Sequence, residues 1–229
     1  MKYIVNGSTD PYFNMALDEW CLEHLPSGEY FFRLWQNLPS VIIGRSQDAA
    51  AEVNAAYLKE KRIALVRRST GGGAVYHDLG NLNYSIWGPE PKPDVIVTAL
   101  QEMGVAAELS GRNDIFVDGR KVSGYARRVF QDRELVHGTL MWDVDIDVLT
   151  RVLDTPGSKL NVKGVASVPN RVGNLAPLMP NLHSVQDFAS ALLSYVSTDD
   201  EFVLSPEALS EISGIARYKR MSPKWHPFL

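Results

Sequence analysis

A run of three glycines within residues 67–81, RRSTGGGAVYHDLGN, most constrains what this chain can fold into. Consecutive glycines weaken both helices and strands, so this segment is predicted to be a loop. Without Cβ atoms, its backbone N–H groups can approach a ligand closely and form a concave anion-binding site. The glycine spacing matches neither a Walker loop nor a dinucleotide-binding fingerprint. Arg67 and Arg68 precede the glycines, so a phosphate is a plausible ligand of this loop.

Composition indicates a folded chain without a strong charge bias. The chain has 229 residues, of which 45% are hydrophobic and 22% are charged, and residues 1–229 are predicted to form a single domain with its own core. A net charge of -4 argues against nucleic-acid binding and against a membrane-surface role. The sequence shows no long apolar run and no signal-peptide pattern, so we expect a cytoplasmic setting.

The single cysteine, Cys21, excludes an internal disulfide and a multi-cysteine zinc site. Cys21 lies on the apolar face of a predicted helix, where a free cysteine packs as a small hydrophobe. We therefore interpret Cys21 as a core residue and not as a nucleophile.

Short strands and helices alternate without a regular strand–helix–strand rhythm, which predicts an α+β fold with a mixed, largely antiparallel sheet and packed helices. A hairpin turn is expected at Asp118-Gly119. The predicted helices cover residues 11–25, 49–62, 94–104, 146–153, 184–197 and 205–219. The predicted strands lie within residues 1–5, 30–36, 39–46, 64–69, 80–88, 108–130 and 134–145.

Four polar, glycine-bearing segments fall at the ends of these strands, where binding groups usually gather on a rigid scaffold. They are residues 67–81, 110–124 (SGRNDIFVDGRKVSG), 137–140 (HGTL) and 161–174 (NVKGVASVPNRVGN). Together they predict a shared pocket. The five histidines are scattered without metal-ligand spacing, so the pair His77-Asp78 is interpreted as structural, and no G-x-S-x-G motif indicates a serine nucleophile.

The wording and order of these segments resemble the lipoate-protein ligase A family. The N-terminal segments DPYFNMALDEW and RLWQNLPSVIIGRSQ take part in the same resemblance, which extends over residues 10–182. The resemblance implies the biotin/lipoate ligase fold, which is related to class II aminoacyl-tRNA synthetases. That fold agrees with the α+β prediction made from the pattern of strands and helices.

The resemblance also implies a two-step reaction. Lipoate and ATP with Mg²⁺ would give lipoyl-adenylate and pyrophosphate, and the lipoyl group would then pass to a lysine of an acceptor. The implied acceptors are the lipoyl domains of 2-oxoacid dehydrogenase complexes and the glycine-cleavage H protein. The negative charge that builds up in such a reaction needs preorganised cations and N–H donors.

Carried over position by position, the resemblance assigns the catalytic role to Lys121, which would contact the lipoate carboxylate and the adenylate phosphate. Asn113 and Asp114 would hold ATP or its Mg²⁺, and Lys163 would lie in a loop over the adenylate. Trp35 and Leu140 are further candidates for an apolar tunnel. The remaining implied binding residues are Arg68, Gly71, Gly72, Gly73, Ala74, Val75, Tyr76, His77, His137, Gly138 and Thr139.

Alternatives to an autonomous ligase remain open at this point. Large ligases of this family carry a C-terminal accessory domain, which is not expected within residues 1–229 and could be a separate subunit. A transferase of the same fold that moves octanoyl or lipoyl groups without ATP would need a cysteine nucleophile after the HGTL segment, and no cysteine follows Cys21. A non-enzymatic subunit that binds lipoate or lipoyl domains would not need an ATP site.

Overall fold

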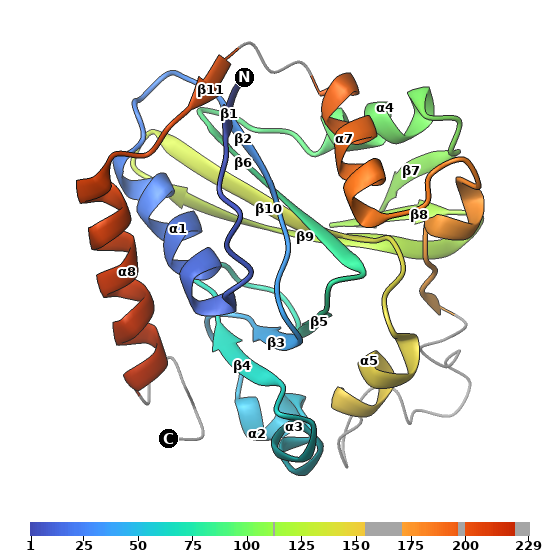
Figure 1. Cartoon of the computed structure of the whole chain (residues 1–229), viewed down its shortest axis with the longest axis horizontal. Coiled ribbons are helices and arrows are strands. Elements are labelled where there is room, and N and C mark those ends of the chain that lie inside the picture. The colour runs from blue at the N-terminus through green and yellow to red at the C-terminus, as the bar shows by residue number, and fades with distance from the viewer. Residues whose placement is uncertain (112, 154–170, 197–199, 223–229) are drawn as a thin grey trace.

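In a computed structural model, an eight-stranded sheet crosses the whole molecule (Figure 1). The structure describes residues 1–111, 113–153, 171–196 and 200–222. The order of strands in this sheet is β11-β1-β2-β6-β10-β9-β8-β7. Their bounds are β1 Lys2–Ile4, β2 Phe31–Trp35, β6 Asn81–Gly88, β7 Ala107–Ser110, β8 Asp114–Val117, β9 Arg120–Phe130, β10 Arg133–Met141 and β11 Asp200–Phe202.

The sheet is mixed, as predicted. Strand β1 pairs in parallel with both β2 and β11, whereas the pairs β2–β6, β6–β10, β10–β9, β9–β8 and β8–β7 are antiparallel. A second, three-stranded sheet has the order β4-β3-β5, with bounds Ala64–Arg67, Ser40–Ile43 and Val75–His77. The predicted α+β class is therefore confirmed.

Helices cover both faces of the large sheet. In Figure 1, α1 (Pro11–His24) and α8 (Pro206–Met221) lie side by side on one side of the molecule, and α4 (Asp94–Glu102) and α7 (Val185–Tyr195) lie on another. The helices α2 (Ala49–Glu52), α3 (Ala55–Lys61) and α5 (Ile146–Val152) contribute to a core with the small sheet. A 3₁₀ turn, η2, covers Ala176–Leu178.

Strand β2 shows why the predicted strands are apolar on both sides. Phe31 belongs to the core cluster formed with α1 and α8, whereas Phe32 belongs to the cluster formed with α4 and α7. Successive side chains of a strand point to opposite faces of the sheet. All five residues of β2 are buried for this reason.

The predicted helix starts are confirmed by their caps. The Asp10 carboxylate accepts from the backbone N–H of Tyr12 at 3.0 Å, with Pro11 in the first turn. Ser205 caps α8 in the same way, by accepting from the backbone N–H of Ala208. The predicted hairpin turn is also present, because Asp118 and Gly119 have φ of 49° and 73°.

One predicted helix is divided in the structure, and two short strands were not predicted. Residues 49–62 do not form one helix, because Asn54 starts a second helix by accepting from the backbone N–H of Tyr57. The predicted strands β2 and β3 are present, but they belong to different sheets. Strands β5 and β11 were not predicted, since each has only three residues and shows no periodic pattern.

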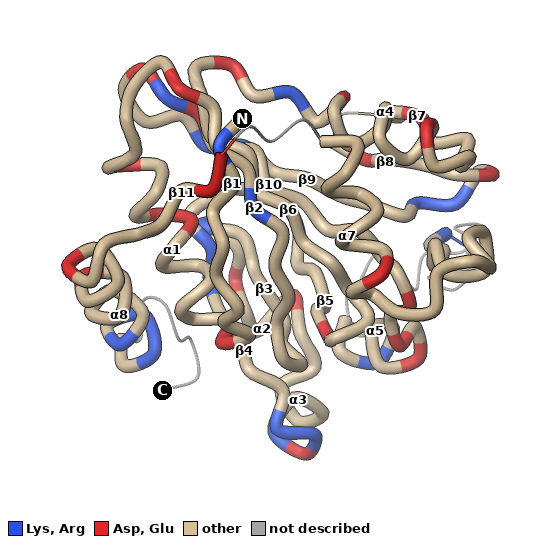
Figure 2. The backbone as a smooth tube through the Cα atoms, turned by 45° about the horizontal axis from the view of Figure 1, so that its top comes forward, with Lys and Arg blue, Asp and Glu red and all other residues tan. Residues whose placement is uncertain are grey.

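The last turn of α8 is fixed by a buried lysine. Figure 2 shows basic positions in the last turns of α3 and α8, where a positive charge complements the helix dipole. Lys219 in α8 is only 1% exposed, and its Nζ lies 2.6 Å from a carboxylate oxygen of Glu19 in α1. Arg128 approaches the same carboxylate at 3.6 Å. This ion-pair cluster joins α8, α1 and β9.

We expect Lys219→Met to lower the free energy of unfolding by about 2 kcal/mol, because among the described residues it leaves the Glu19 carboxylate with only the more distant Arg128 as an ion-pair partner. Urea unfolding measures this loss. The matched control is Arg217→Met, an exposed position on the same helix, for which we expect a change below about 0.5 kcal/mol. Equal effects of the two substitutions would contradict a stabilising role for the buried lysine.

Candidate functional site

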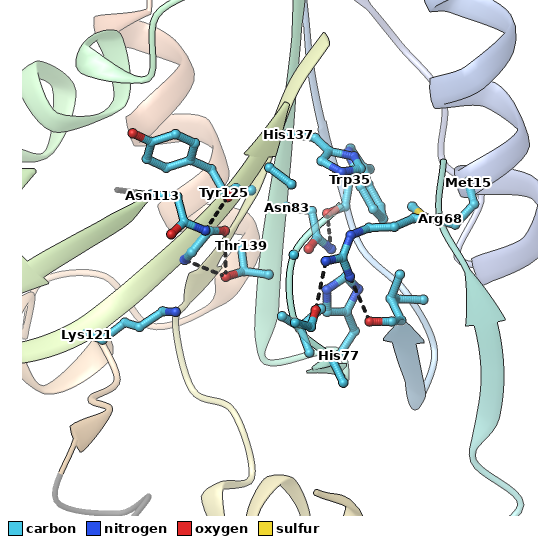
Figure 3. A pocket seen from close by; sticks show the side chains of 18 residues that line it. Met15, Trp35, Arg68, His77, Asn83, Asn113, Lys121, Tyr125, His137 and Thr139 are labelled. Atoms are coloured by element: carbon cyan, nitrogen blue, oxygen red, sulfur yellow. Dashed lines mark hydrogen bonds between the residues drawn. The ribbon is translucent and has the colours of Figure 1, made fainter. Parts of the chain in front are cut away.

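A pocket lies where the glycine loop meets the large sheet (Figure 3). It encloses about 600 Å³ of empty space, a volume that includes space open to solvent. Five regions of the chain build it: α1 with β2, strand β3, the glycine loop with β5, the β8–β9 hairpin, and β10 beside β6. Three of the four segments predicted to share a pocket, residues 67–81, 110–124 and 137–140, therefore meet here, whereas most of the fourth, residues 161–174, lies outside the described residues.

Most of the predicted binding residues line this pocket. Leu140 packs instead in the core, and Lys163 lies outside the described residues. Gly71, Tyr76 and Asp114 are close in sequence to lining residues but do not line the pocket themselves. The predicted residues that do line it are Trp35, Arg68, Gly72, Gly73, Ala74, Val75, His77, Asn113, Lys121, His137, Gly138 and Thr139.

Lys121 reaches the pocket because of a β-bulge. Ile115 pairs with Ser123 but Phe116 pairs with Lys121, so Val122 is an extra residue on β9. A bulge of this kind redirects the neighbouring side chains. The Lys121 ammonium lies 2.7 Å from the Asp114 carboxylate and is 36% exposed, so it is held in place yet accessible to a ligand.

Gly124 provides the space for this ammonium group. A Cβ added at Gly124 would lie 2.9 Å from Nζ of Lys121 and 3.1 Å from its Cε. The backbone N–H of Gly124 donates to the Thr139 hydroxyl at 3.2 Å. Asn113 lies in the same wall, with its side-chain amide donating to the carbonyl of Tyr125 at 2.8 Å. These groups form the polar end of the pocket in Figure 3.

Arg68 holds the glycine loop in shape. Its guanidinium is almost fully buried and donates to the carbonyls of Ile42, Gly71 and Gly73 at 2.7 to 3.1 Å. Burial lowers the pKa of Arg68 to about 10, which leaves the group charged at neutral pH. The geometry gives Arg68 a role in ordering the loop. A direct contact between Arg68 and a phosphate stays a prediction.

The segment after β3 packs directly beneath the loop. The backbone N–H of Arg45 donates to the carbonyl of Thr70 at 2.8 Å. The Arg67 guanidinium donates to the carbonyls of Gly44 and Gln47 at 3.0 and 2.7 Å. A Cβ on Gly44 would lie only 2.2 Å from the carbonyl oxygen of Gly72. Gly44 is therefore required for the close approach of the two loops.

His77 is a neutral, buried histidine in the pocket wall opposite Lys121 (Figure 3). Its Nδ1 lies 3.0 Å from the side-chain nitrogen of Asn37, whose oxygen accepts from the Asn14 amide. Asn37 therefore donates to Nδ1, which places the imidazole proton on Nε2. Burial, together with smaller effects of the nearby Arg68 and His137, lowers the pKa of His77 to about 3. The sequence-based interpretation of His77 as a structural histidine agrees with this setting.

The low pKa of His77 predicts a loss of stability in acid. An unfolded histidine titrates near pH 6.5, so below that pH the unfolded chain binds a proton that native His77 excludes until about pH 3. Between pH 7.5 and pH 5, the free energy of unfolding of the wild-type protein should fall by about 2 kcal/mol more than that of His77→Gln. Urea unfolding at the two pH values measures this difference. Identical pH dependence in both proteins would contradict it.

His137 connects the pocket to the interior of the protein. Its Nδ1 lies 2.7 Å from the carboxylate of Asp18, and its Nε2 lies 2.8 Å from the hydroxyl of Thr70. Asp18 and Thr70 are 1% exposed and do not line the pocket, whereas His137 does. The three side chains have the spacing of a catalytic triad, but the buried Thr70 hydroxyl has no access to a substrate. The arrangement is suited to holding the His137 ring in position and not to nucleophilic attack by Thr70.

The described residues contain neither a gathered set of metal ligands nor a membrane-spanning helix. Among these residues, no three His, Cys, Asp or Glu side chains are gathered to hold a metal ion. None of the helices within the described ranges has the length and apolar character needed to cross a membrane.

Comparison with known proteins identifies the family. The model of the lipoyl protein ligase A/B catalytic domain matches residues 10–197, which includes every region that lines the pocket. The chain belongs to this family. The resemblance read from the glycine loop and its companion segments is thereby confirmed.

Individual relatives agree with the lipoyl ligase assignment. The chain is 37% identical to lipoate-protein ligase LplJ of Bacillus subtilis, over 99% of its own length and 73% of that protein. It has a TM-score of 0.87 and 27% identity to a chain from the bi-partite lipoate protein ligase of Thermoplasma acidophilum, solved in a study with its E2 lipoyl domain, with 98% and 95% of the two chains covered. A lipoate-protein ligase A bound with ATP gives a TM-score of 0.85 at 26% identity, with 98% and 97% covered.

Several pocket residues of this lipoyl ligase domain were missed from the sequence. Asn83 and Gly124 line the pocket, and Asp18 and Gly44 support its walls. A signal for Asp18 was available, because Asn14 and Asp18 are polar positions four residues apart in the otherwise apolar stretch 11–18 of this helix. A polar pair on a buried helix face indicates an internal hydrogen-bond network.

Proposed function

We propose that this chain is a lipoate-protein ligase that activates lipoate with ATP and transfers the lipoyl group to a lysine of an acceptor domain. The observation that carries the proposal is the pocket itself. It gathers Lys121, the glycine loop and His137 from distant parts of the chain into one small-molecule site. Family membership and the ATP-bound structural relative support the same conclusion.

The first step requires activation of a carboxylate, which is a poor electrophile. An oxygen of lipoate attacks the α-phosphate of ATP, pyrophosphate leaves, and a mixed anhydride forms. The Lys121 ammonium is a compact charge with three donors, so it suits a bridging position between carboxylate and phosphate. Its pairing with Asp114 keeps it at the pocket wall before the substrate arrives.

In the second step, the amine of the acceptor lysine attacks the lipoyl carbonyl, and AMP leaves with the bonding electrons. Negative charge develops on the carbonyl oxygen during this attack, and a fixed cation lowers the barrier. Lys121 can serve both steps, because the same carbonyl and phosphate remain bound between them. The backbone of Gly72 and Gly73, fixed by Arg68, would form the opposite side of the adenylate site.

ATP would bring Mg²⁺, which neutralises phosphate charge. Mg²⁺ is usually held by one or two carboxylates together with substrate phosphates. Asn113 in the pocket lining and the neighbouring Asp114, which contacts Lys121 and is 27% exposed, would provide such a donor set. We therefore assign these two residues to the metal and nucleotide side of the site.

A transferase route through a thioester is less well supported. The only cysteine, Cys21, is fully buried in α1, and burial raises the pKa of its thiol well above the usual range. A buried thiol that resists ionisation is a poor nucleophile. No pocket-lining residue is a cysteine among those that the structure describes.

The acceptor that we propose is a lipoyl domain, by analogy with the Thermoplasma system studied with its E2 lipoyl domain. The glycine-cleavage H protein is a second proposed acceptor. The test is incubation of purified chain, ATP, Mg²⁺ and lipoate with each acceptor, followed by intact-mass measurement. We expect one lipoyl group on one lysine, only when ATP is present. Acceptor modification from an octanoyl carrier protein without ATP would instead identify a transferase.

The need for an accessory subunit stays a prediction. The chain spans 73% of the Bacillus subtilis relative, and the same acceptor assay with and without an accessory-domain polypeptide tests the requirement. Synthetic lipoyl-adenylate separates the two steps. We expect it to support transfer even if activation requires a second polypeptide.

A further inference from the structure

We propose that Asp18 is a positioning residue of the pocket, which acts by fixing the tautomer of His137 and, through Thr70, the position of Arg68 and the glycine loop. The inference deepens the proposed function, because the loop is one wall of the adenylate site. Asp18 lies in α1, outside the segments from which the binding residues were predicted.

The contacts form one continuous chain across the protein interior. Asp18 in α1 lies 2.7 Å from Nδ1 of His137 in β10, and Nε2 of that histidine lies 2.8 Å from the Thr70 hydroxyl in the loop. The Thr70 oxygen lies 3.0 Å from Nε of Arg68. The exposure of these four residues does not exceed 7%, so water competes little with the contacts.

The direction of each hydrogen bond follows from donor chemistry. Arginine only donates, so the Thr70 oxygen accepts from Arg68. The buried Thr70 proton then needs an acceptor, and Nε2 of His137 is within reach. An imidazole that accepts at Nε2 carries its proton on Nδ1, which donates to Asp18.

The surroundings of Asp18 support this direction. Trp35 can only donate, and its Nε1 donates to Ser85, so the Ser85 hydroxyl proton is directed to the other oxygen of Asp18. The positively charged Arg33 lies 3.9 Å from the same carboxylate. The Asp18 oxygen that faces His137 therefore accepts a hydrogen bond from Nδ1–H and does not donate one.

The consequence is a fixed orientation of the loop that carries the glycines. Arg68 donates to Thr70 on one side and to the carbonyls of Gly71 and Gly73 on the other. If the His137 proton moved to Nε2, the Thr70 proton would lose its acceptor, and the position of Arg68 would change. Displacements of about 1 Å far from the reacting atoms can reduce turnover about 100-fold.

Two sets of variants test the proposal. Asp18→Asn should place the His137 proton on Nε2, by analogy with the aspartate-to-asparagine change in a serine protease triad. We expect kcat/KM for acceptor lipoylation to fall about 10- to 100-fold. Thr70→Val should show a loss of similar size, whereas Thr70→Ser, which keeps the hydroxyl, should retain activity within about threefold of wild type.

The decisive readout is the tautomer of His137, which ¹⁵N nuclear magnetic resonance of the imidazole reports without any assay of activity. We expect Nδ1–H in the wild type and Nε2–H in Asp18→Asn. Nε2–H in the wild type would overturn the proposal, as would equal activity of Thr70→Val and Thr70→Ser.

Asp18→Asn could fail to fold because Arg33 loses its partner charge. In that case the wild-type tautomer of His137 and the activities of Thr70→Val and Thr70→Ser still test the positioning role. If the wild-type chain lacks ligase activity altogether, the proposed function fails. The tautomer and the binding of lipoyl-adenylate to the Thr70 variants then test the positioning role separately.

Discussion

Lys121→Ala should abolish lipoate activation and lower the rate of acceptor lipoylation by about 100-fold or more. The substitution removes the only lysine among the described residues that line the pocket, while the charge on the substrates stays the same. The side chain is 36% exposed at the pocket wall, so its loss should leave the folded structure intact. Steady-state kinetics with ATP, lipoate and a lipoyl domain measure the effect, and thermal unfolding checks the fold.

The matched control for this prediction is Lys92→Ala, which removes an equal charge from an exposed position before α4. We expect turnover within about twofold of the wild type for this variant, because it lies outside the pocket lining. Turnover of Lys121→Ala within threefold of the control would show that the lysine was assigned the wrong role.

Gly44→Ala should disturb the pocket from beneath. The added methyl group would lie 2.2 Å from the carbonyl oxygen of Gly72, which is backbone and cannot rotate away as a side chain would. The glycine loop must therefore shift. We expect the free energy of unfolding to fall by about 1–3 kcal/mol and lipoate affinity to fall about tenfold or more. Urea unfolding and calorimetric titration measure the two effects.

Gly71→Ala provides the comparison for stability. A Cβ at Gly71 meets no atom within 4 Å, and this glycine does not have a positive φ. We expect its free energy of unfolding to change by less than about 1 kcal/mol. If Gly44→Ala unfolds at the same urea concentration as Gly71→Ala and binds lipoate like the wild type, the close approach of the two loops does not control the site.

Local chemistry explains which parts of the fold could be predicted. Asp10 and Ser205 start helices because their side chains accept from backbone N–H groups, and this depends only on neighbouring residues. The hairpin at Asp118-Gly119 is likewise set by two adjacent residues that tolerate positive φ. By contrast, the three residues of β5 form a strand only because β3 is there to pair with them. The local sequence pattern therefore could not predict strand β5.

The same distinction holds for the site. The glycine loop, Lys121 and His137 were predicted because their segments carry a family resemblance, and the structure brings them into one pocket. The Asp18–His137 contact joins residues 119 positions apart, and no periodic pattern reports such a pairing. The bulge that directs Lys121 toward Asp114 also depends on strand register, which the sequence does not display.

The central claim is that this pocket makes lipoyl-adenylate, and lipoate-dependent exchange between ATP and labelled pyrophosphate tests it most directly. The assay is run on the chain alone and with an accessory-domain polypeptide. We expect exchange that requires lipoate and that is lost in Lys121→Ala but kept in Lys92→Ala. A folded chain that binds lipoate but catalyses no exchange under either condition would contradict it.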